Sequence, residues 1–393
     1  MSIQRIQEEL KKNNIDGWLL YDFQNRDVLS YRVLGLDEKK HTSRRWFYFI
    51  PAEGEPVKLT HSVEPTKLDS LPGKKVIYLP WVQLHKELKD ILGSPKNIAM
   101  QYSPKNEIPY ISIVDAGTVE LIRSFGHTIV SSADLIQTFE ALIDDKSYKL
   151  MKKANELIYS IKDEAFEFVH KAVYDNKKLK EHEIADFILK RIEEEGMVSE
   201  GTPITGVNDH PADPHFEPTV ENSYYVNKGD TLLMDLWGKI DTPGGIFCDI
   251  TWCGFLGDNP PAKYIEMFDT VMRGRDAAVE FVTKRFENGD PCYGWEVDDA
   301  CRNVVKAAGY GDYFVHRTGH SIGEEVHGNG AHIDNLETKD NRQIVPGICF
   351  SVEPGIYIMK EKLAVRTEID VFINYDGKVE VTGPMQKELV LLK

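Results

Sequence analysis

The first part of the chain alternates between helical and extended patterns of apolar residues. A polar helical pattern at the start is followed by apolar runs at residues 17–21, 46–50 and 76–79, which predict strands. This alternation is typical of an α/β domain, which we expect to span residues 1–143. Its histidines have no carboxylates at ligand spacing, so no chemistry is predicted in this domain. They are His41, His61, His85 and His127.

The pattern changes near residues 142–147 to long amphipathic helices, in which apolar residues recur three and four positions apart. We place a domain boundary there and expect a second domain over residues 144–393. Two helices, two strands, two further helices and a last group of strands follow in order, at residues 148–173, 181–195, 231–237, 247–255, 262–286, 295–308, 348–358 and 363–373. The repeated helix–helix–strand–strand order predicts an internally pseudo-symmetric α+β domain.

The composition is that of a globular protein with an acidic surface. Of the 393 residues, 41% are hydrophobic, and 47 Lys and Arg stand against 63 Asp and Glu, a net charge of −16. This charge repels phosphate backbones and anionic membranes, so neither nucleic acid nor a membrane is expected as a partner. The cysteines are odd in number and form no CxxC pair, which favours reduced thiols. No stretch has the pattern of a signal peptide or membrane span, and we expect a cytoplasmic protein.

Acidic residues interrupt the predicted strands of the second domain. Asp235 and Asp249 lie inside the first two strands, and Glu353 and Glu368 inside the last ones. A carboxylate that is removed from water must be paired, bound to a metal or protonated. Each acid alone would be interpreted as a solvated strand position or as half of a salt bridge. Together in one region they indicate a site.

Turn chemistry and strand alternation predict that these acids meet. Residues 241–245, Asp-Thr-Pro-Gly-Gly, have the composition of a tight turn, so the strands that carry Asp235 and Asp249 are expected to form a hairpin. Period-two alternation places Arg366 and Glu368 on one face of a later strand.

Histidines of the same domain add imidazole groups. His320 is flanked by glycines on a predicted tight loop, and His327 follows it. An oxygen-rich site with one or two imidazoles suits Mn²⁺, Fe²⁺, Co²⁺ or Zn²⁺ rather than an ion that prefers thiolates. Several carboxylates around one histidine can hold two such ions, which share a water of lowered pKa. His210 and His332 are interpreted as loop histidines that bond to solvent or backbone.

The residues Asp235, Asp249, His320, Glu353 and Glu368, in this order and in these local phrases, resemble the metal-ligand set of the methionine aminopeptidase, prolidase and aminopeptidase P superfamily. The resemblance implies the pita-bread fold for the second domain. A smaller α/β domain before the catalytic domain is similar to the layout of the prolidase, aminopeptidase P and creatinase branch. The resemblance therefore covers essentially the whole chain.

The resemblance implies a role for each ligand. Asp235 would bind one metal ion, and Asp249 and Glu368 would bridge two ions. His320 and Glu353 would complete the second metal position, and Glu353 would also act as general base and acid. Two divalent ions per chain are expected, manganese first, with cobalt, zinc or iron as alternatives.

The resemblance also implies residues that contact a substrate. His215 and His327 would lie beside the scissile carbonyl and donate hydrogen bonds to its developing oxyanion. His316 and Arg366 match positions that line the substrate pocket in this family.

These matches imply hydrolysis of the peptide bond after an N-terminal residue that precedes proline, with a metal-bridging hydroxide as nucleophile. The substrates would be small peptides with proline in second position, so the enzyme would be an Xaa-Pro dipeptidase or an Xaa-Pro aminopeptidase, and a homodimer is expected. Two alternatives stay open. One is a creatinase-like C–N hydrolase that works without metal, and the other is a catalytically silent binding protein with this fold.

Several positions depart from the family pattern. The hairpin between Asp235 and Asp249 is longer, and we assign the surplus to residues 239–244. Asp241 is therefore a rival first ligand, but a flexible turn positions a metal poorly, so strand context favours Asp235. Three further departures leave the ligands intact and bear on substrate specificity and ligand orientation. They are Trp252, Ser321 and Gly328.

Overall fold

The structure is a computed structural model that describes residues 2–393, and its contacts divide the chain into two compact units, Met1–Glu140 and Ala141–Lys393. Each unit has its own apolar core. Among residues 2–393, no helix combines the length and the apolar character needed to cross a bilayer.

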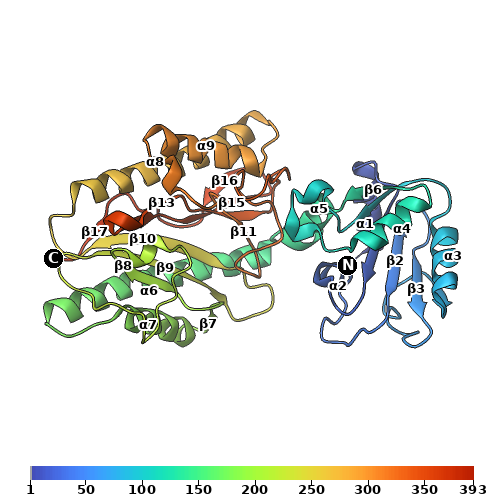
Figure 1. The fold of residues 1–393 in the computed structure, drawn as a ribbon, viewed down its shortest axis with the longest axis horizontal. Helices are drawn as coiled ribbons and strands as arrows, with labels where there is room; N and C mark the ends of the chain where they lie inside the picture. Colours follow the sequence, from blue (N-terminus) through green and yellow to red (C-terminus); the bar gives the residue numbers. More distant parts are fainter. Residues whose placement is uncertain (1) are drawn as a thin grey trace. The chain divides into compact units, whose positions relative to one another are not determined.

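The N-terminal unit is built on a six-stranded mixed sheet with the strand order β4-β3-β2-β1-β5-β6 (Figure 1). Its strands are β1 (Gly17–Asp22), β2 (Trp46–Pro51), β3 (Val57–His61), β4 (Lys74–Tyr78), β5 (Asn97–Met100) and β6 (Thr128–Ser131). Its helices are α1 (Ile3–Lys12), α2 (Val28–Leu34), α3 (Trp81–Leu92), α4 (Ala116–Ser124) and α5 (Ala133–Ile136). Apolar residues of α1, α2 and α5 pack on one face of the sheet, and those of α3 and α4 pack on the other. Strands β1 and β2 are apolar at almost every position, so side chains on both faces of the sheet have to be buried, and helices cover both faces.

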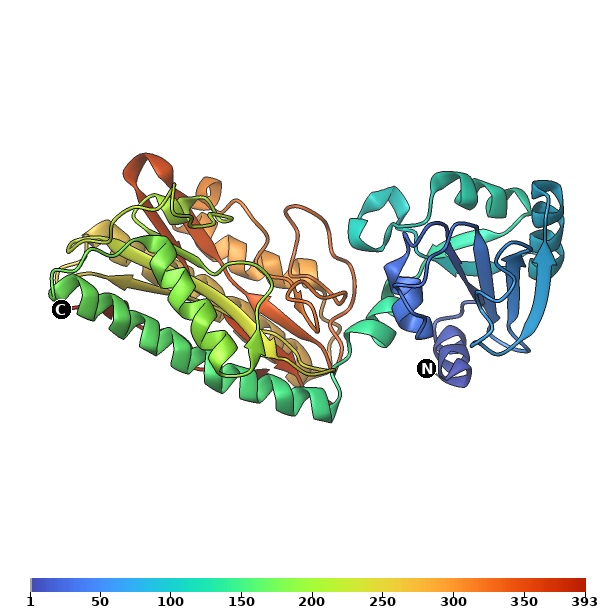
Figure 2. The same cartoon turned by 90° about the horizontal axis from the view of Figure 1, so that it is seen from below.

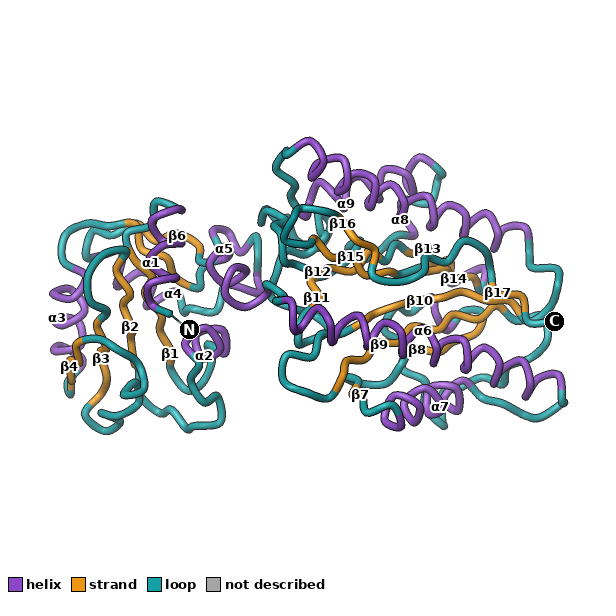
Figure 3. Tube along the Cα trace, turned by 180° about the vertical axis from the view of Figure 1, so that it is seen from behind, coloured by secondary structure: helices purple, strands orange, loops and turns teal. Residues whose placement is uncertain are grey.

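The C-terminal unit has two pairs of helices with strands between them, as Figure 1 and the reverse view in Figure 3 show. One pair is α6 (Asp145–Tyr174) and α7 (Glu181–Glu194), and the other is α8 (Ala262–Asn288) and α9 (Gly294–Ala307). Each pair buries its apolar face against a different group of strands. The long helix α6 begins at its cap Asp144, which accepts a hydrogen bond from the backbone N–H of Ser147 (2.8 Å), and runs along the strands (Figure 2).

The strands of this unit form separate small sheets. They are β7 (Met197–Val198), β8 (Ile204–Val207), β9 (Thr231–Ile240), β10 (Cys248–Phe255), β11 (Ser321–Ile322), β12 (Cys349–Val352), β13 (Gly355–Ile358), β14 (Leu363–Arg366), β15 (Ile369–Ile373), β16 (Val379–Val381) and β17 (Val390–Leu391). One sheet runs β17-β10-β9-β7, with β8 also paired to β9, and a second runs β11-β12-β15-β16. A two-stranded sheet, β13-β14, completes the set.

The last two predicted strands are wrong in one respect, since each is broken into two. Segment 348–358 becomes β12 and β13, which are interrupted at Glu353 and Pro354, and segment 363–373 becomes β14 and β15, interrupted at Thr367 and Glu368. Proline has no N–H to donate to a strand ladder, which favours the first break. Both predicted acids of this region therefore lie at strand breaks rather than at strand centres.

The first hairpin is extended by its strands rather than only by its turn. β9 and β10 are antiparallel, with Asp235 opposite Thr251 and Asp249 opposite Trp237. Part of the surplus that was assigned to the turn belongs to β9, which continues to Ile240 and pairs there with β7. The turn closes at Gly245, where an added Cβ would lie 2.3 Å from the carbonyl oxygen of Ile240.

Candidate metal centre

Three of the predicted ligands converge from three separate segments. Asp249 is near the start of β10, Glu368 is at the break before β15, and His320 directly precedes β11. One ligand atom from each lies within 4.8 Å of the other two, and all three residues are buried. Two hydrogen bonds from backbone N–H groups join the segments that carry Asp249 and Glu368. Glu368 N–H donates to the carbonyl oxygen of Thr251 (3.1 Å), and Asp249 N–H donates to Asp370 Oδ2 (3.0 Å).

The other two predicted ligands adjoin this group. His320 Nε2 lies 3.3 Å from Glu353 Oε1 and 3.6 Å from Asp249 Oδ2. Asp235 is buried on β9 and forms an ion pair with Arg366 through Oδ2. The charge of Asp235 raises the pKa of Asp249, second only to the effect of burial. The structure thus brings all of the predicted ligands into one buried region.

The hydrogen bonds of His320 leave one ring nitrogen directed at the acids. His320 Nδ1 lies 3.2 Å from the carbonyl oxygen of Ser321, to which it can only donate, so Nε2 carries the lone pair. Burial, then the neighbouring His327, hold the pKa of His320 well below its usual value. A neutral imidazole whose other nitrogen bonds to a backbone carbonyl is the form in which histidine binds metal ions.

The buried carboxylates repel one another, and a bound cation would compensate their charge. Burial, followed by repulsion from neighbouring carboxylates, raises the pKa of Asp249 and of Glu368 far above the usual range. Among the described residues, the carboxylate oxygens without a hydrogen-bond partner include Asp235 Oδ1, Asp249 Oδ1 and Glu368 Oε1. Buried oxygens of this kind are costly unless a cation or a proton compensates them. The donor set therefore fits divalent ions that prefer oxygen with some nitrogen.

Glu353 differs from the other acids because it stays partly exposed. Its Oε1 accepts a hydrogen bond from Ser351 Oγ (3.1 Å), and its surroundings raise its pKa to about 7. Removal from water is the main cause, opposed by the charge of Arg366 and reinforced by that of Asp235. A carboxyl group with a pKa near neutrality can both accept and return a proton.

Arg366 and His316 belong to one hydrogen-bond chain. Arg366 donates to Thr251 Oγ1 (3.1 Å) and to the Tyr357 hydroxyl (3.3 Å), in addition to its pair with Asp235. His316 Nδ1 lies 2.7 Å from the carbonyl oxygen of the next residue and must donate to it, so His316 Nε2 accepts from the Tyr357 hydroxyl (2.7 Å). Burial, then Arg366, lowers the pKa of His316 to about 3, which keeps the ring neutral.

His327 and His215 lie on the more open side. The ring of His327 contacts that of His320 edge-on, with 4.3 Å between centroids. Desolvation lowers the pKa of His327 to about 4, with smaller contributions from Arg317 and His215, which places His215 in its neighbourhood. His215 itself is exposed.

Asp241, the rival ligand, is exposed in the turn after β9 and is not in the metal-binding group.

Four site residues were missed by the sequence analysis, although period-two alternation could have found three of them. Thr251, Ser351 and Asp370 each lie two positions from a predicted ligand. The hydroxyl of Thr251 donates to Glu368 Oε2 (2.8 Å), and that of Ser351 accepts from His320 N–H (3.0 Å). Tyr357 had no such signal. Nothing in its local sequence marks it as the bridge between Arg366 and a loop histidine.

Two of the departures from the family pattern lie against each other. Gly328 N–H donates to the carbonyl oxygen of Ser321 (2.7 Å), and an added Cβ at Gly328 would lie 3.0 Å from Ser321 Oγ. A larger side chain at Gly328 would therefore crowd the serine. Trp252 faces α6 instead, where Lys162 Nζ lies 3.6 Å from its ring centroid. It belongs to the packing of that helix rather than to the acid cluster.

The two loop histidines of the second domain, His332 and His210, have structural partners. His332 Nδ1 accepts a hydrogen bond from Ser321 N–H (3.0 Å), as expected of a histidine bonded to backbone. For His210 that expectation is wrong, because its Nδ1 pairs with the carboxylate of Glu181 at 2.7 Å. Glu181 is fully buried and also accepts from the backbone of Val207 and Tyr224. The carboxylate thereby ties down the loop that carries His215.

The buried acids and the neutral imidazole form a donor set that suits a divalent metal ion. A model of metallopeptidase family M24 matches residues 149–374, more than half of the chain. The chain therefore belongs to metallopeptidase family M24, and the predicted pita-bread fold is confirmed.

Individual relatives extend the similarity to the whole chain. The putative dipeptidase YkvY of Bacillus subtilis is 27% identical over 321 residues, which cover 80% of this chain and 78% of that protein. The structure of dipeptidase PepE from Mycobacterium ulcerans matches with a TM-score of 0.70 at 21% identity, covering 99% of this chain and 96% of that one. The structure of a prolidase from Thermococcus sibiricus matches with a TM-score of 0.64 at 22% identity, covering 99% and 98%. The two-domain prolidase-like fold is thus confirmed over its full length.

Proposed function

We propose that this metallopeptidase is a dipeptidase that prefers dipeptides with proline in second position and that works with two divalent metal ions, manganese first. The observation that carries the proposal is the convergence of Asp249, Glu368 and the Nε2 of His320 within 4.8 Å, with buried carboxylate oxygens that lack partners. Similarity to proteins named dipeptidase and prolidase supports the substrate class.

The metal ions would be held by Asp235, Asp249, His320, Glu353 and Glu368. When bound, they would polarise the peptide carbonyl and lower the pKa of a water molecule. An oxygen-rich donor set with one imidazole supports manganese over zinc, with cobalt and iron as alternatives. The charge of the ions would also relieve the repulsion among the acids.

Proton transfer is assigned to Glu353. Its Oε1 faces the ligand nitrogen of His320, and Ser351 holds the same oxygen by a hydrogen bond. Glu353 would take a proton from the attacking water and return it to the leaving nitrogen.

Four further side chains are assigned to the substrate. His215 and His327 would donate hydrogen bonds to the carbonyl oxygen as it gains charge. Arg366 and His316, joined through Tyr357, would line the pocket and hold its shape. A proline nitrogen has no N–H in the peptide bond, so selectivity for it would come from the shape of the pocket rather than from a hydrogen bond.

The test is hydrolysis of matched peptides by the protein after chelation and reloading with one metal at a time. Ala-Pro, Ala-Ala and Ala-Pro-Ala should separate the possibilities. We expect Ala-Pro to be cleaved fastest, with Mn²⁺ restoring the activity that chelation removes. Preference for Ala-Pro-Ala would indicate an aminopeptidase, and preference for Ala-Ala a dipeptidase without proline selectivity. A loaded protein that cleaves none of the three would contradict the proposal.

The site variants are Asp249→Asn and Glu368→Gln, which keep the shape of each side chain and remove its charge. Both should bind less metal and lose activity. Either variant with full turnover would refute the assignment. We also propose a homodimer, which light scattering of the purified protein would test.

A further inference from the structure

A buried ion pair on α9 lies next to the loop that carries two site histidines. Asp298 and Arg302 are one helical turn apart, with Arg302 Nη2 2.8 Å from Asp298 Oδ1, and they are 0% and 3% exposed. A buried pair of this kind adds little net stability compared with apolar packing, because both charges lose their water. Its other partners indicate what it does.

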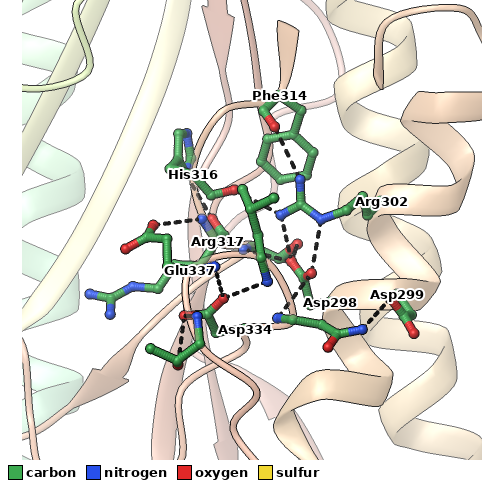
Figure 4. A network of polar contacts seen from close by, with 12 residues as sticks. Asp298, Asp299, Arg302, Phe314, His316, Arg317, Asp334 and Glu337 are labelled. Atoms are coloured by element: carbon green, nitrogen blue, oxygen red, sulfur yellow. Dashed lines mark hydrogen bonds and ion pairs between the residues drawn. The ribbon is translucent and has the colours of Figure 1, made fainter. Parts of the chain in front are cut away.

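Those partners lie in the segment between α9 and β11, with one exception, the backbone N–H of Asn335. Asp298 Oδ1 accepts from Thr318 N–H (3.0 Å) and from Thr318 Oγ1 (2.6 Å). Arg302 donates to the carbonyl oxygens of Phe314 (3.1 Å) and His316 (2.8 Å). Figure 4 shows the two side chains reaching from the helix to this segment. Two charged groups thus fix the backbone at Phe314, His316 and Thr318.

The same segment is aligned with β12. The carbonyl oxygen of Thr318 accepts from Glu353 N–H (2.7 Å), and that of His320 accepts from Ser351 N–H (2.8 Å). Gly319, between them, approaches so closely that an added Cβ would lie 1.9 Å from the carbonyl oxygen of Ser351. A shift of Thr318 would therefore displace His320 on one side and Glu353 on the other.

We propose that Asp298 and Arg302 are positioning residues of the metal centre, which hold residues 314–320 in register with β12 so that His320 Nε2 and Glu353 face the same metal position. The inference rests on the proposed function, because it concerns the same centre. The pair touches neither metal nor substrate, and its effect passes through Thr318 and the backbone of His316.

The experiment is a titration with Co²⁺ of the full-length protein from which a chelator has removed metal ions. Binding is measured by calorimetry and by the visible absorption of the bound Co²⁺. The variants are Asp298→Asn and Thr318→Val, with Thr318→Ser as the conservative version that keeps the hydroxyl. Glu296→Gln is the matched control, because Glu296 is on the same helix and pairs with Arg285 (2.6 Å) rather than with the loop. The unfolding midpoint of each variant is measured alongside.

We expect Asp298→Asn to weaken Co²⁺ binding by roughly 10- to 100-fold, the usual effect of removing a group that orients a metal ligand, and to alter the absorption band. Thr318→Val should weaken binding in the same direction, and Thr318→Ser should restore it. Glu296→Gln should leave Co²⁺ affinity within about twofold, whatever its effect on the unfolding midpoint, since none of its contacts reaches a metal ligand.

The outcomes separate the two proposals. Wild-type protein that binds no Co²⁺ would refute the metal centre itself. Wild-type binding together with unchanged affinity and spectrum in Asp298→Asn would refute the positioning role alone, whatever happens to the unfolding midpoint. If Asp298→Asn does not fold, the comparison of Thr318→Val with Thr318→Ser decides, and equal Co²⁺ affinity in these two would overturn the inference.

Discussion

Removal of the Thr251 hydroxyl gives the sharpest test of the candidate metal centre. This hydroxyl donates to Glu368 Oε2 (2.8 Å) and accepts from Arg366 Nε (3.1 Å), and the residue is fully buried. Thr251→Val keeps the shape of the side chain and removes both bonds. Arg366 keeps its contacts with Asp235 and Tyr357, so the bond to Glu368 is the one that bears on the metal.

A hydrogen bond to a charged group contributes roughly 1.5–3 kcal/mol. The bond is already present without metal, so only its strengthening when the ions hold Glu368 as a carboxylate bears on affinity, and Thr251→Val should weaken Mn²⁺ binding by roughly tenfold, the lower end of the effect of removing a partner of a metal ligand. The measurement is calorimetric titration of the chelated protein with Mn²⁺, together with hydrolysis of Ala-Pro.

The matched control is Thr270→Val on α8. Thr270 is 1% exposed, and its hydroxyl donates to a neutral backbone carbonyl, that of Glu266, at 2.8 Å. Both variants lose a buried hydroxyl, but Thr270 has no contact with a predicted ligand. If Thr251→Val binds Mn²⁺ as tightly as Thr270→Val and the wild type, the reasoning that links this hydroxyl to the metal is refuted.

Three further predictions concern other parts of the molecule. Burial raises the pKa of Asp27 from 3.8 to about 7, so the folded state binds more protons between these pH values, and stability should fall as pH rises, by up to roughly 4 kcal/mol from this group. Asp27→Asn should make the slope of stability against pH less steep in unfolding followed by tryptophan fluorescence, and an unchanged slope would contradict the shift. Glu181→Gln should loosen the loop that carries His215 and raise KM more than it lowers Mn²⁺ affinity, whereas equal effects would assign Glu181 to the metal centre. Saturation with Mn²⁺ at about 100 times Kd should stabilise the chelated protein by about 2.7 kcal/mol for each bound ion, and an unfolding midpoint that does not respond would argue against a site in the folded state.

The layered fold could be predicted because apolar residues recur along each helix and strand at the spacing typical of that element. The long helices and the hairpin of β9 and β10 follow from local patterns, and the structure confirms their type and order. The breaks at Glu353 and Glu368 were missed, because alternation continues across them. Tertiary partners decide where such a strand ends, and Glu368 N–H bonds to Thr251 on another sheet.

The candidate site could be predicted where chemistry conflicts with its local setting. An acid in an apolar strand or a histidine between glycines is unusual enough to be noticed, and the structure brings these residues together. Their roles as ligands stay predictions. Asp298 and Arg302 gave no such signal, because charged residues one turn apart on a helix are common on exposed faces. Only the packing of α9 reveals that both are buried.

The placement of the acids on different sheets has a mechanical consequence. Asp249 belongs to the sheet of β9 and β10, whereas Glu368 leads into β15 of the other sheet, and Glu368 N–H donates to the carbonyl oxygen of Thr251 across the boundary between the two sheets. Divalent ions held by both acids would link the two sheets across that boundary. Removal of the ions should then allow the two sheets to separate locally and transiently. The amide hydrogens of Asp249 and Glu368 should then exchange with solvent faster than those at the centres of either sheet.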